Sequence, residues 1–280
     1  MKSKFSIDID NSINSGQVFL WEKDGANWYG INGQDVLKVN KNRTIKSILN
    51  SKTNFFRKND NIEEIIRSIS KDKTVKNAVK EYDGLRIFDQ EPFQCMISFI
   101  ISSNSNIQKI KSSLEKITKK FGTKVTIQNK EFFLFPKPEE IAKATISEIK
   151  TCGVGYRAPF IKEASKMVAL KRINFKYLQK CDYQEAKKNL LLVPGIGNKV
   201  ADCIMLFSLN KLNAFPLDTW MIKILEKYYS NEFKIETKTI TEKQYDILHE
   251  KIENYFGPYC GYSQQFLFKM EREKYDKKWL

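Results

Sequence analysis

The sequence predicts an α+β fold that is mainly helical, with a small antiparallel sheet followed by an all-helical core. Two observations predict this order. Between residues 5 and 39, short alternating segments are separated by Asp24-Gly25 and Asn32-Gly33, which are dipeptides typical of hairpin turns. From about residue 60 onward, apolar residues instead recur every three or four positions, as they do in helices that pack on a core. With 280 residues, the chain is long enough to bury a sizeable core.

The N-terminal part is predicted to be a meander followed by one amphipathic helix. Its apolar segments lie at residues 18–21, 28–31 and 36–39. Ile62, Ile65, Ile66 and Ile69 then form a helical stripe behind an Asp/Asn cap. Because a turn-forming Tyr-Asp-Gly follows at 82–84, we expect domains of residues 1–82 and 83–280.

Only helices are predicted in the second domain. Their expected ranges are 92–101, 107–121, 141–152, 158–170, 183–192, 199–209, 219–229, 241–255 and 262–272. Residues 123–138 are poorly patterned and are predicted to be a loop. His249, the only histidine, argues against zinc sites and histidine triads, and we expect it at the surface or at a helix cap.

Composition narrows the class of protein. A formal charge of +15 and a pI near 9.4 suit a polyanionic partner, although a lysine-rich proteome explains them equally well. No apolar run reaches the roughly 18 residues of a membrane helix, and the N-terminus lacks the apolar core of a signal peptide. Five cysteines without a CxxC pair predict reduced thiols in an intracellular protein.

The stretch from 191 to 225 organises the chain. Residues 193–197 read Val-Pro-Gly-Ile-Gly, a turn that joins two predicted helices into a helix-hairpin-helix, with Asn198 expected at the second N-cap. Gly195 and Gly197 would expose backbone N–H groups at a helix N-terminus, where a phosphate binds well. Lys199 begins that helix, and Asp218 follows Phe-Pro-Leu at another expected cap. Taken alone, Lys199 would be a phosphate contact and Asp218 a plain cap.

With Lys199 and Asp218 at this spacing, the hairpin resembles the helix-hairpin-helix superfamily of base-excision DNA glycosylases (HhH-GPD). Within it, the segments LVPGIGNKVADCI, FPLD and GPYCGYSQQFLF are similar to the 8-oxoguanine DNA glycosylase/AP lyases, with anchors from Gly16 to Phe268. The resemblance implies an N-terminal domain like half of a TATA-binding protein. It also implies a glycosylase core of two subdomains with the active site in the cleft between them.

The resemblance also implies partners and cofactors. The partner is double-stranded DNA containing oxidised guanine, and no redox cofactor is expected. Some superfamily members hold an iron–sulfur cluster on four C-terminal cysteines, but only Cys260 lies in that region here. The family further implies a monovalent cation at the hairpin, residues 192–197. We expect a monomer in contact with the chromosomal DNA, in a prokaryotic cytoplasm or a nucleus, and no membrane association.

The resemblance assigns roles to residues of the active site. The lysine matching Lys199 attacks C1′ of the damaged nucleotide, and the strand is then cut by β-elimination. The aspartate matching Asp218 stabilises the positive charge on the sugar. Cys203, one helical turn after Lys199, and Phe268 sandwich the base, while Gln264 reads its edge. Core packing is the alternative for Cys203 and Phe268.

The remaining roles concern recognition of the lesion and its surroundings. Gly16 matches a glycine whose carbonyl distinguishes 8-oxoguanine from guanine at N7, with a simple turn as the alternative. Asn104 matches the residue that fills the vacated stack, Tyr156 the wedge, and Arg157 a donor to the orphaned cytosine. The alternatives are a loop cap, a core aromatic residue and a phosphate contact. Lys109 stands where eukaryotic members have an arginine that faces this cytosine, and it lacks the planar donor fork.

Two other functions remain open at this point. One is a helix-hairpin-helix glycosylase for a different damaged base, against which Gly16, Gln264 and Phe268 argue. The other is a non-catalytic DNA-binding protein that uses the same hairpin, in which Lys199 and Asp218 would be coincidental.

Overall fold

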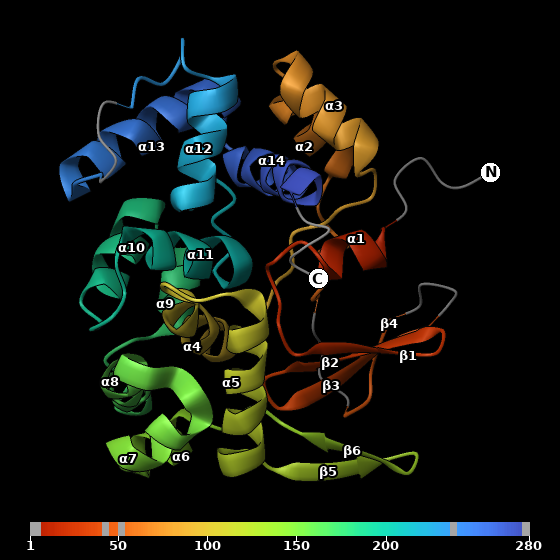
Figure 1. Ribbon diagram of the computed structural model, residues 1–280, viewed down its shortest axis with the longest axis vertical. Coiled ribbons are helices and arrows are strands. Elements are labelled where there is room, and N and C mark those ends of the chain that lie inside the picture. The colour runs from red at the N-terminus through yellow and green to blue at the C-terminus, as the bar shows by residue number, and fades with distance from the viewer. Residues whose placement is uncertain (1–6, 41–44, 50–53, 236–239, 276–280) are drawn as a thin grey trace.

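A small antiparallel sheet lies beside a larger helical body, which confirms the predicted fold class (Figure 1). The structure is a computed structural model that describes residues 7–40, 45–49, 54–235 and 240–275. The sheet has four strands in the order β1-β2-β3-β4, each antiparallel to the next. The strands are β1 Trp21–Asp24, β2 Asn27–Asn32, β3 Asp35–Val39 and β4 Ile45–Ser47.

A short helix that the sequence did not predict precedes the sheet. In α1, Ile9–Ile13, the side chain of Asp8 accepts a hydrogen bond from the backbone N–H of Asn11. The helix spans only five residues, which is too short to show a helical period in the sequence. Its two isoleucines pack with Trp21 and the phenylalanines behind the sheet in a separate small core.

The predicted helix after the sheet is confirmed as α2, Ile62–Ile69, and a second helix, α3, spans Lys73–Glu81. Both pack against the C-terminal helix α14, Cys260–Tyr275. Their buried side chains, including Ile65 and Val75, belong to the main core of the helical body. These helices therefore share the core of the C-terminal part, although the chain reaches them directly from the sheet.

The prediction of a loop at 123–138 is wrong, because this segment contains a β-hairpin. Strands β5, Lys124–Ile127, and β6, Lys130–Phe133, are antiparallel and are joined by Gln128 and Asn129, both with positive φ. Phe132 packs with Val36 of the N-terminal sheet in a third small core. The hairpin is therefore stabilised by a surface about 90 residues earlier in the chain, which a local pattern does not reveal.

The other helices largely follow the predicted ranges. They are α4 Pro92–Ser102, α5 Ile107–Phe121, α6 Pro138–Lys143, α7 Ile146–Ile149, α8 Ala158–Ala169, α9 Phe175–Lys180, α10 Tyr183–Leu191, α11 Asn198–Ser208, α12 Thr219–Tyr228 and α13 Glu242–Phe256. The single helix expected at 141–152 is divided between α6, α7 and a wide turn, and α9 was not predicted. Helix α4 is buried along most of its length and packs on α5, α8 and α11.

The expected surface position of His249 is wrong. Its ring is buried and stacks on the ring of Tyr183, with 4.5 Å between the centroids. Its Nε2 lies 3.0 Å from the carbonyl oxygen of Asn213. The pattern of apolar residues around position 249 does not predict this burial, because both contacting residues, Tyr183 and Asn213, come from other parts of the chain. Among the residues that the structure describes, no helix combines the length and apolar character needed to cross a membrane.

Candidate active site

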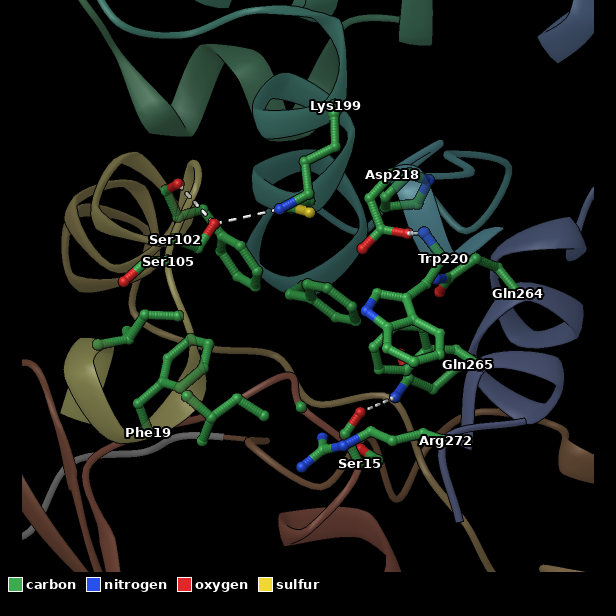
Figure 2. Close-up of a pocket in the computed structure, with 18 of the residues that line it drawn as sticks. Ser15, Phe19, Ser102, Ser105, Lys199, Asp218, Trp220, Gln264, Gln265 and Arg272 are labelled. Carbon is green, nitrogen blue, oxygen red and sulfur yellow. Dashed lines mark hydrogen bonds between the residues drawn. The ribbon is translucent and has the colours of Figure 1, made fainter. Parts of the chain in front are cut away.

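A cavity of about 160 Å³ lies where the segment before the sheet meets α4, α11, α12 and α14 (Figure 2). A buried apolar cavity of about 150 Å³ can hold a benzene ring, so this one has room for part of an aromatic ligand. Its lining contains six of the residues singled out from the sequence, and these are Gly16, Lys199, Cys203, Asp218, Gln264 and Phe268. The fold thus brings together residues that lie more than 250 positions apart.

The hairpin turn between α10 and α11 places Lys199 at this cavity. Gly195 has φ +86°, and a Cβ atom there would lie 2.7 Å from the Cβ of Phe160, so only glycine fits. The expectation that Asn198 caps α11 is wrong: Gly197 is the N-cap and Asn198 is the first helical residue. The extended Gly197 offers no side-chain cap. The first N–H groups of α11 therefore keep their capacity to bind an anion.

Lys199 is half-buried, and its amine points into the cavity (Figure 2). Its Nζ donates a hydrogen bond of 3.1 Å to Ser102 Oγ and lies 5.5 Å from the centre of the Phe99 ring. The hydroxyl of Ser102 in turn donates to the carbonyl of Phe99, at 2.8 Å. Because its proton is used there, the Ser102 oxygen presents a lone pair to the amine.

Cys203 lies one turn after Lys199 on the face of α11 that lines the cavity. Burial raises the pKa of its thiol to about 12, while the neighbouring Lys199 lowers it and Asp218 raises it further. The thiol therefore remains protonated at neutral pH, and a protonated thiol is a poor nucleophile. Of the two, the amine of Lys199 is the better candidate for covalent chemistry.

Asp218 is the N-cap of α12, as predicted. One of its carboxylate oxygens accepts hydrogen bonds from the backbone N–H groups of Trp220, at 3.0 Å, and Met221, at 2.8 Å. The other oxygen faces the cavity on the side of Lys199 (Figure 2). The positive end of the helix stabilises the ionised carboxylate. The site thus places a fixed negative charge near an amine.

The opposite wall contains Gly16 and the residues of α14. Gly16 has φ +83°, and a Cβ there would lie 3.2 Å from the Phe268 ring. Gln265 donates a 2.7 Å hydrogen bond to the carbonyl of Ser15, and this bond fixes the backbone at Gly16. The Oε1 of Gln264 is buried and has no hydrogen-bond partner among the described residues. Such a buried acceptor is suited to a ligand donor, which favours Gln264 over Gln265 as the reader.

A second group of predicted residues lies at the loop after α4. The exposed Asn104 has φ +51°, a conformation that asparagine tolerates better than most residues. Arg157 is buried, and its guanidinium donates to the carbonyls of Ser103, Asn104 and Val154. The guanidinium therefore holds this loop in place, so it is not free at the surface as its predicted role would suggest.

Tyr156 connects this loop to the hairpin. Its side chain is 58% exposed. Its ring lies 4.5 Å from the Arg157 guanidinium and packs edge-on against Phe160, the residue that contacts Gly195. Lys109 is exposed on the first turn of α5. Among the cavity residues, Phe99 and Ser102 were missed from the sequence, because nothing local distinguishes them from other residues of a buried helix.

Comparisons with known proteins show which family the chain resembles. Residues 97–250 match the model of the HhH-GPD superfamily base excision DNA repair protein, and residues 1–96 match the 8-oxoguanine DNA glycosylase N-terminal domain. An N-glycosylase/DNA lyase OGG1 from Arabidopsis thaliana is 28% identical over 276 residues, covering 92% of this chain and 75% of the relative.

Solved structures show the same similarity. The 8-oxoguanine glycosylase/lyase of Clostridium acetobutylicum, in complex with double-stranded DNA containing cytosine opposite to 8-oxoG, has a TM-score of 0.85 at 30% identity. The match covers 96% of this chain and 93% of that chain. The 3-methyladenine DNA glycosylase from Archaeoglobus fulgidus, at 18% identity and a TM-score of 0.76 over 97% of both chains, shares the fold.

Proposed function

The chain belongs to the HhH-GPD superfamily of base excision DNA repair proteins and, within it, to the 8-oxoguanine DNA glycosylase/lyases, and on that premise we propose the residues that carry its reaction. Lys199 is the nucleophile and Asp218 the electrostatic partner. Gly16, Cys203, Gln264 and Phe268 bind the extruded base. The substrate is duplex DNA that contains 8-oxoguanine.

Base recognition uses Cys203 on the wall of Lys199 and the residues of the opposite wall. The flipped base lies between the Phe268 ring and Cys203, and the Gln264 amide bonds with its Watson–Crick edge. Oxidation at C8 converts N7 of guanine from an acceptor to a donor. The carbonyl of Gly16, held in place through Gln265 and Ser15, accepts this hydrogen bond and repels the N7 lone pair of normal guanine.

Lys199 carries the covalent step. Its neutral amine attacks C1′, and the bond from C1′ to the base breaks, so the base leaves with the electron pair and is then protonated. The attached nitrogen then loses a proton and the C1′–O4′ bond breaks, with O4′ taking up a proton, so that the opened sugar is held as a Schiff base. This Schiff base loses a 2′ proton, and the C3′–O3′ bond breaks by β-elimination, with the 3′ phosphate leaving with the electron pair. Ser102 accepts a hydrogen bond from the resting amine and orients it. The carboxylate of Asp218 stabilises the positive charge that develops on the sugar.

The single observation that carries this proposal is the position of Lys199 and Asp218 in one cavity, opposite an open acceptor on Gln264. The test is incubation of the protein with a duplex containing one 8-oxoguanine in the presence of borohydride, which reduces a Schiff base to a stable adduct. We expect a covalent complex and release of the oxidised base. Excision without any trapped complex would exclude the lysine mechanism.

Asn104, Tyr156 and the hairpin N–H groups of Gly195, Gly197 and Asn198 are proposed to contact the DNA backbone and the gap left by the base. Tyr156 supports this role because it is a large aromatic side chain that the fold leaves exposed. Arg157 fixes the loop of Asn104 through its three carbonyl contacts. A contact to cytosine would use whichever of its N–H groups DNA binding frees from these carbonyls.

A monovalent cation at the hairpin is also proposed. Residues 192–197 offer no carboxylate, thiol or imidazole, and their only donors are main-chain carbonyl oxygens. Hard cations prefer oxygen ligands, so these carbonyl oxygens would hold a monovalent ion, which would supply positive charge for a DNA phosphate. The proposed site of action is the chromosomal DNA inside the cell, as is typical of a base-excision repair family.

Substitution of the stacking ring should lower activity without a matching loss of stability. Phe268→Leu keeps apolar bulk but removes the aromatic face, and base–aromatic stacking contributes about 1–3 kcal/mol per base. We expect kcat/KM for lesion excision to fall about tenfold or more. The matched control is Phe266→Leu, a core position two residues earlier on α14 that does not line the cavity. Equal losses of activity in both variants would make Phe268 a packing residue.

Discrimination for the base opposite the lesion should be weak, because Arg157 is engaged with main-chain carbonyls and Lys109 has no planar donor fork. We expect Lys109→Arg to raise the ratio of excision rates opposite cytosine and thymine by about a factor of ten, the low end of the contribution of one bidentate contact. Lys119→Arg, exposed further along α5, is the control. Sharp cytosine selectivity in the parent, unchanged by Lys109→Arg, would show that this position does not read the opposite base.

A further inference from the structure

A buried carboxylate lies next to the cavity without lining it. Asp202 follows Lys199 by three residues on α11 and is fully buried. Both of its oxygens are hydrogen-bonded: Oδ1 accepts from the hydroxyl of Tyr183, at 2.7 Å, and Oδ2 accepts from the hydroxyl of Tyr245, at 2.5 Å. The two tyrosines come from α10 and α13, so one side chain connects three helices.

Tyr245 extends this network to the segment that carries Asp218. Its hydroxyl oxygen accepts a 3.1 Å hydrogen bond from the backbone N–H of Leu217, the residue directly before Asp218. Two consecutive hydrogen bonds therefore connect the helix of Lys199 to the cap position of Asp218. Tyr183 differs in this respect, since its only described hydroxyl bond is the one to Asp202.

Stability alone is a weak reason for this arrangement. Burial of a carboxylate is unfavourable, and well-packed apolar side chains would join the same helices at least as firmly. Burial indeed raises the pKa of Asp202, and Lys187 and His249 nearby partly offset this effect. Hydrogen bonds differ from apolar contacts because they fix distance and direction. The network is thus suited to holding Leu217 in one place relative to α11.

We propose that Asp202 and Tyr245 are positioning residues that fix the Asp218 carboxylate relative to the Lys199 amine during excision. This inference rests on the proposed roles of Lys199 and Asp218. Neither Asp202 nor Tyr245 lines the cavity, so both act through the main chain at 217 and 218. Small displacements of a reacting group slow a reaction strongly, so the arrangement should affect the chemical step more than DNA binding.

The test compares two variants that each remove one hydroxyl and one hydrogen bond to Asp202. Tyr245→Phe also frees Leu217, whereas Tyr183→Phe leaves the 217–218 segment bonded. We expect Tyr245→Phe to slow single-turnover excision between about tenfold and a hundredfold, with Kd for the lesion duplex unchanged. Tyr183→Phe should also lower the thermal unfolding temperature, though by less because it breaks fewer hydrogen bonds, and it should slow excision no more than about twofold. Equal slowing by both variants would overturn the proposal.

A double-mutant cycle with Asp218→Asn identifies the route. If Tyr245 acts through the Asp218 carboxylate, Tyr245→Phe should cost little further activity once that carboxylate is absent. A full additional loss would overturn the proposal. Should Tyr245→Phe not fold, Asp202→Asn has nearly the same shape and is expected to slow excision in the same way. Borohydride trapping by the parent protein keeps the two proposals separate. If the parent forms no trapped complex, the proposed function is contradicted. If it does, but Tyr245→Phe and Tyr183→Phe slow excision equally, only the positioning role is contradicted.

Discussion

Lys199→Gln is expected to abolish both base excision and the borohydride-trapped complex while lesion binding stays measurable. Glutamine is one bond shorter than lysine and keeps a polar end that can donate hydrogen bonds on the side of Ser102, so the cavity should keep its general shape. Its amide nitrogen, however, has no available electron pair and cannot attack C1′. The buried thiol of Cys203, whose pKa is about 12, does not substitute for it.

The measurement is a single-turnover assay on an 8-oxoguanine duplex, with denaturing electrophoresis after borohydride reduction. The control is Lys188→Gln, which removes the same charge from an exposed position on α10 and should trap like the parent. Binding of the Lys199→Gln variant to the lesion duplex, measured separately, shows that it is folded. A trapped complex in this variant would mean that another lysine carries the chemistry.

The parts of this site that the sequence predicted are those governed by local chemistry. The Gly-Ile-Gly turn, the lysine that follows it and the capping aspartate lie within 24 residues of one another. The turn and the cap are expected from the conformation that their backbone requires, whereas the role of the lysine came from the family resemblance. Even there the prediction missed the cap of α11 by one residue. Asn198 is the better capping residue, but the extended Gly197 already provides the first helical carbonyl, which Ala201 N–H binds.

What the sequence could not predict depends on partners that are distant in the chain. The β5-β6 hairpin becomes regular because Phe132 packs on Val36, and His249 is buried because the Tyr183 ring covers it. The resemblance placed Gly16 and Phe268 in one site, whereas their close approach, which leaves no room for a side chain at position 16, is a property of the folded chain. The intramolecular contacts of Arg157 were also not predictable. Arginine is typical of DNA contacts, but in this structure its guanidinium donates to main-chain carbonyls of the same chain.

The second large effect is expected from substitution of Asp218, where the contribution of the side chain as a helix cap can be separated from the contribution of its charge to the reaction. Asp218→Asn removes the negative charge but keeps a side-chain oxygen that can accept from Trp220 and Met221, and asparagine caps helices as well as aspartate does. Its unfolding free energy should therefore stay within about 1 kcal/mol of the parent. Loss of one preorganised electrostatic group that stabilises a transition state typically lowers kcat by about 10²–10³-fold. We expect a loss of this size in the excision rate.

Asp218→Ala provides the comparison because it removes the charge and the cap together. It should lose about 1 kcal/mol of stability beyond the asparagine variant, while its excision rate should match that of Asp218→Asn. Thermal unfolding and single-turnover excision, measured on both variants, distinguish the two contributions. If the asparagine variant retained nearly full activity and only the alanine variant lost it, the cap alone would explain Asp218. In that case the charge facing Lys199 would have no part in stabilising the sugar cation.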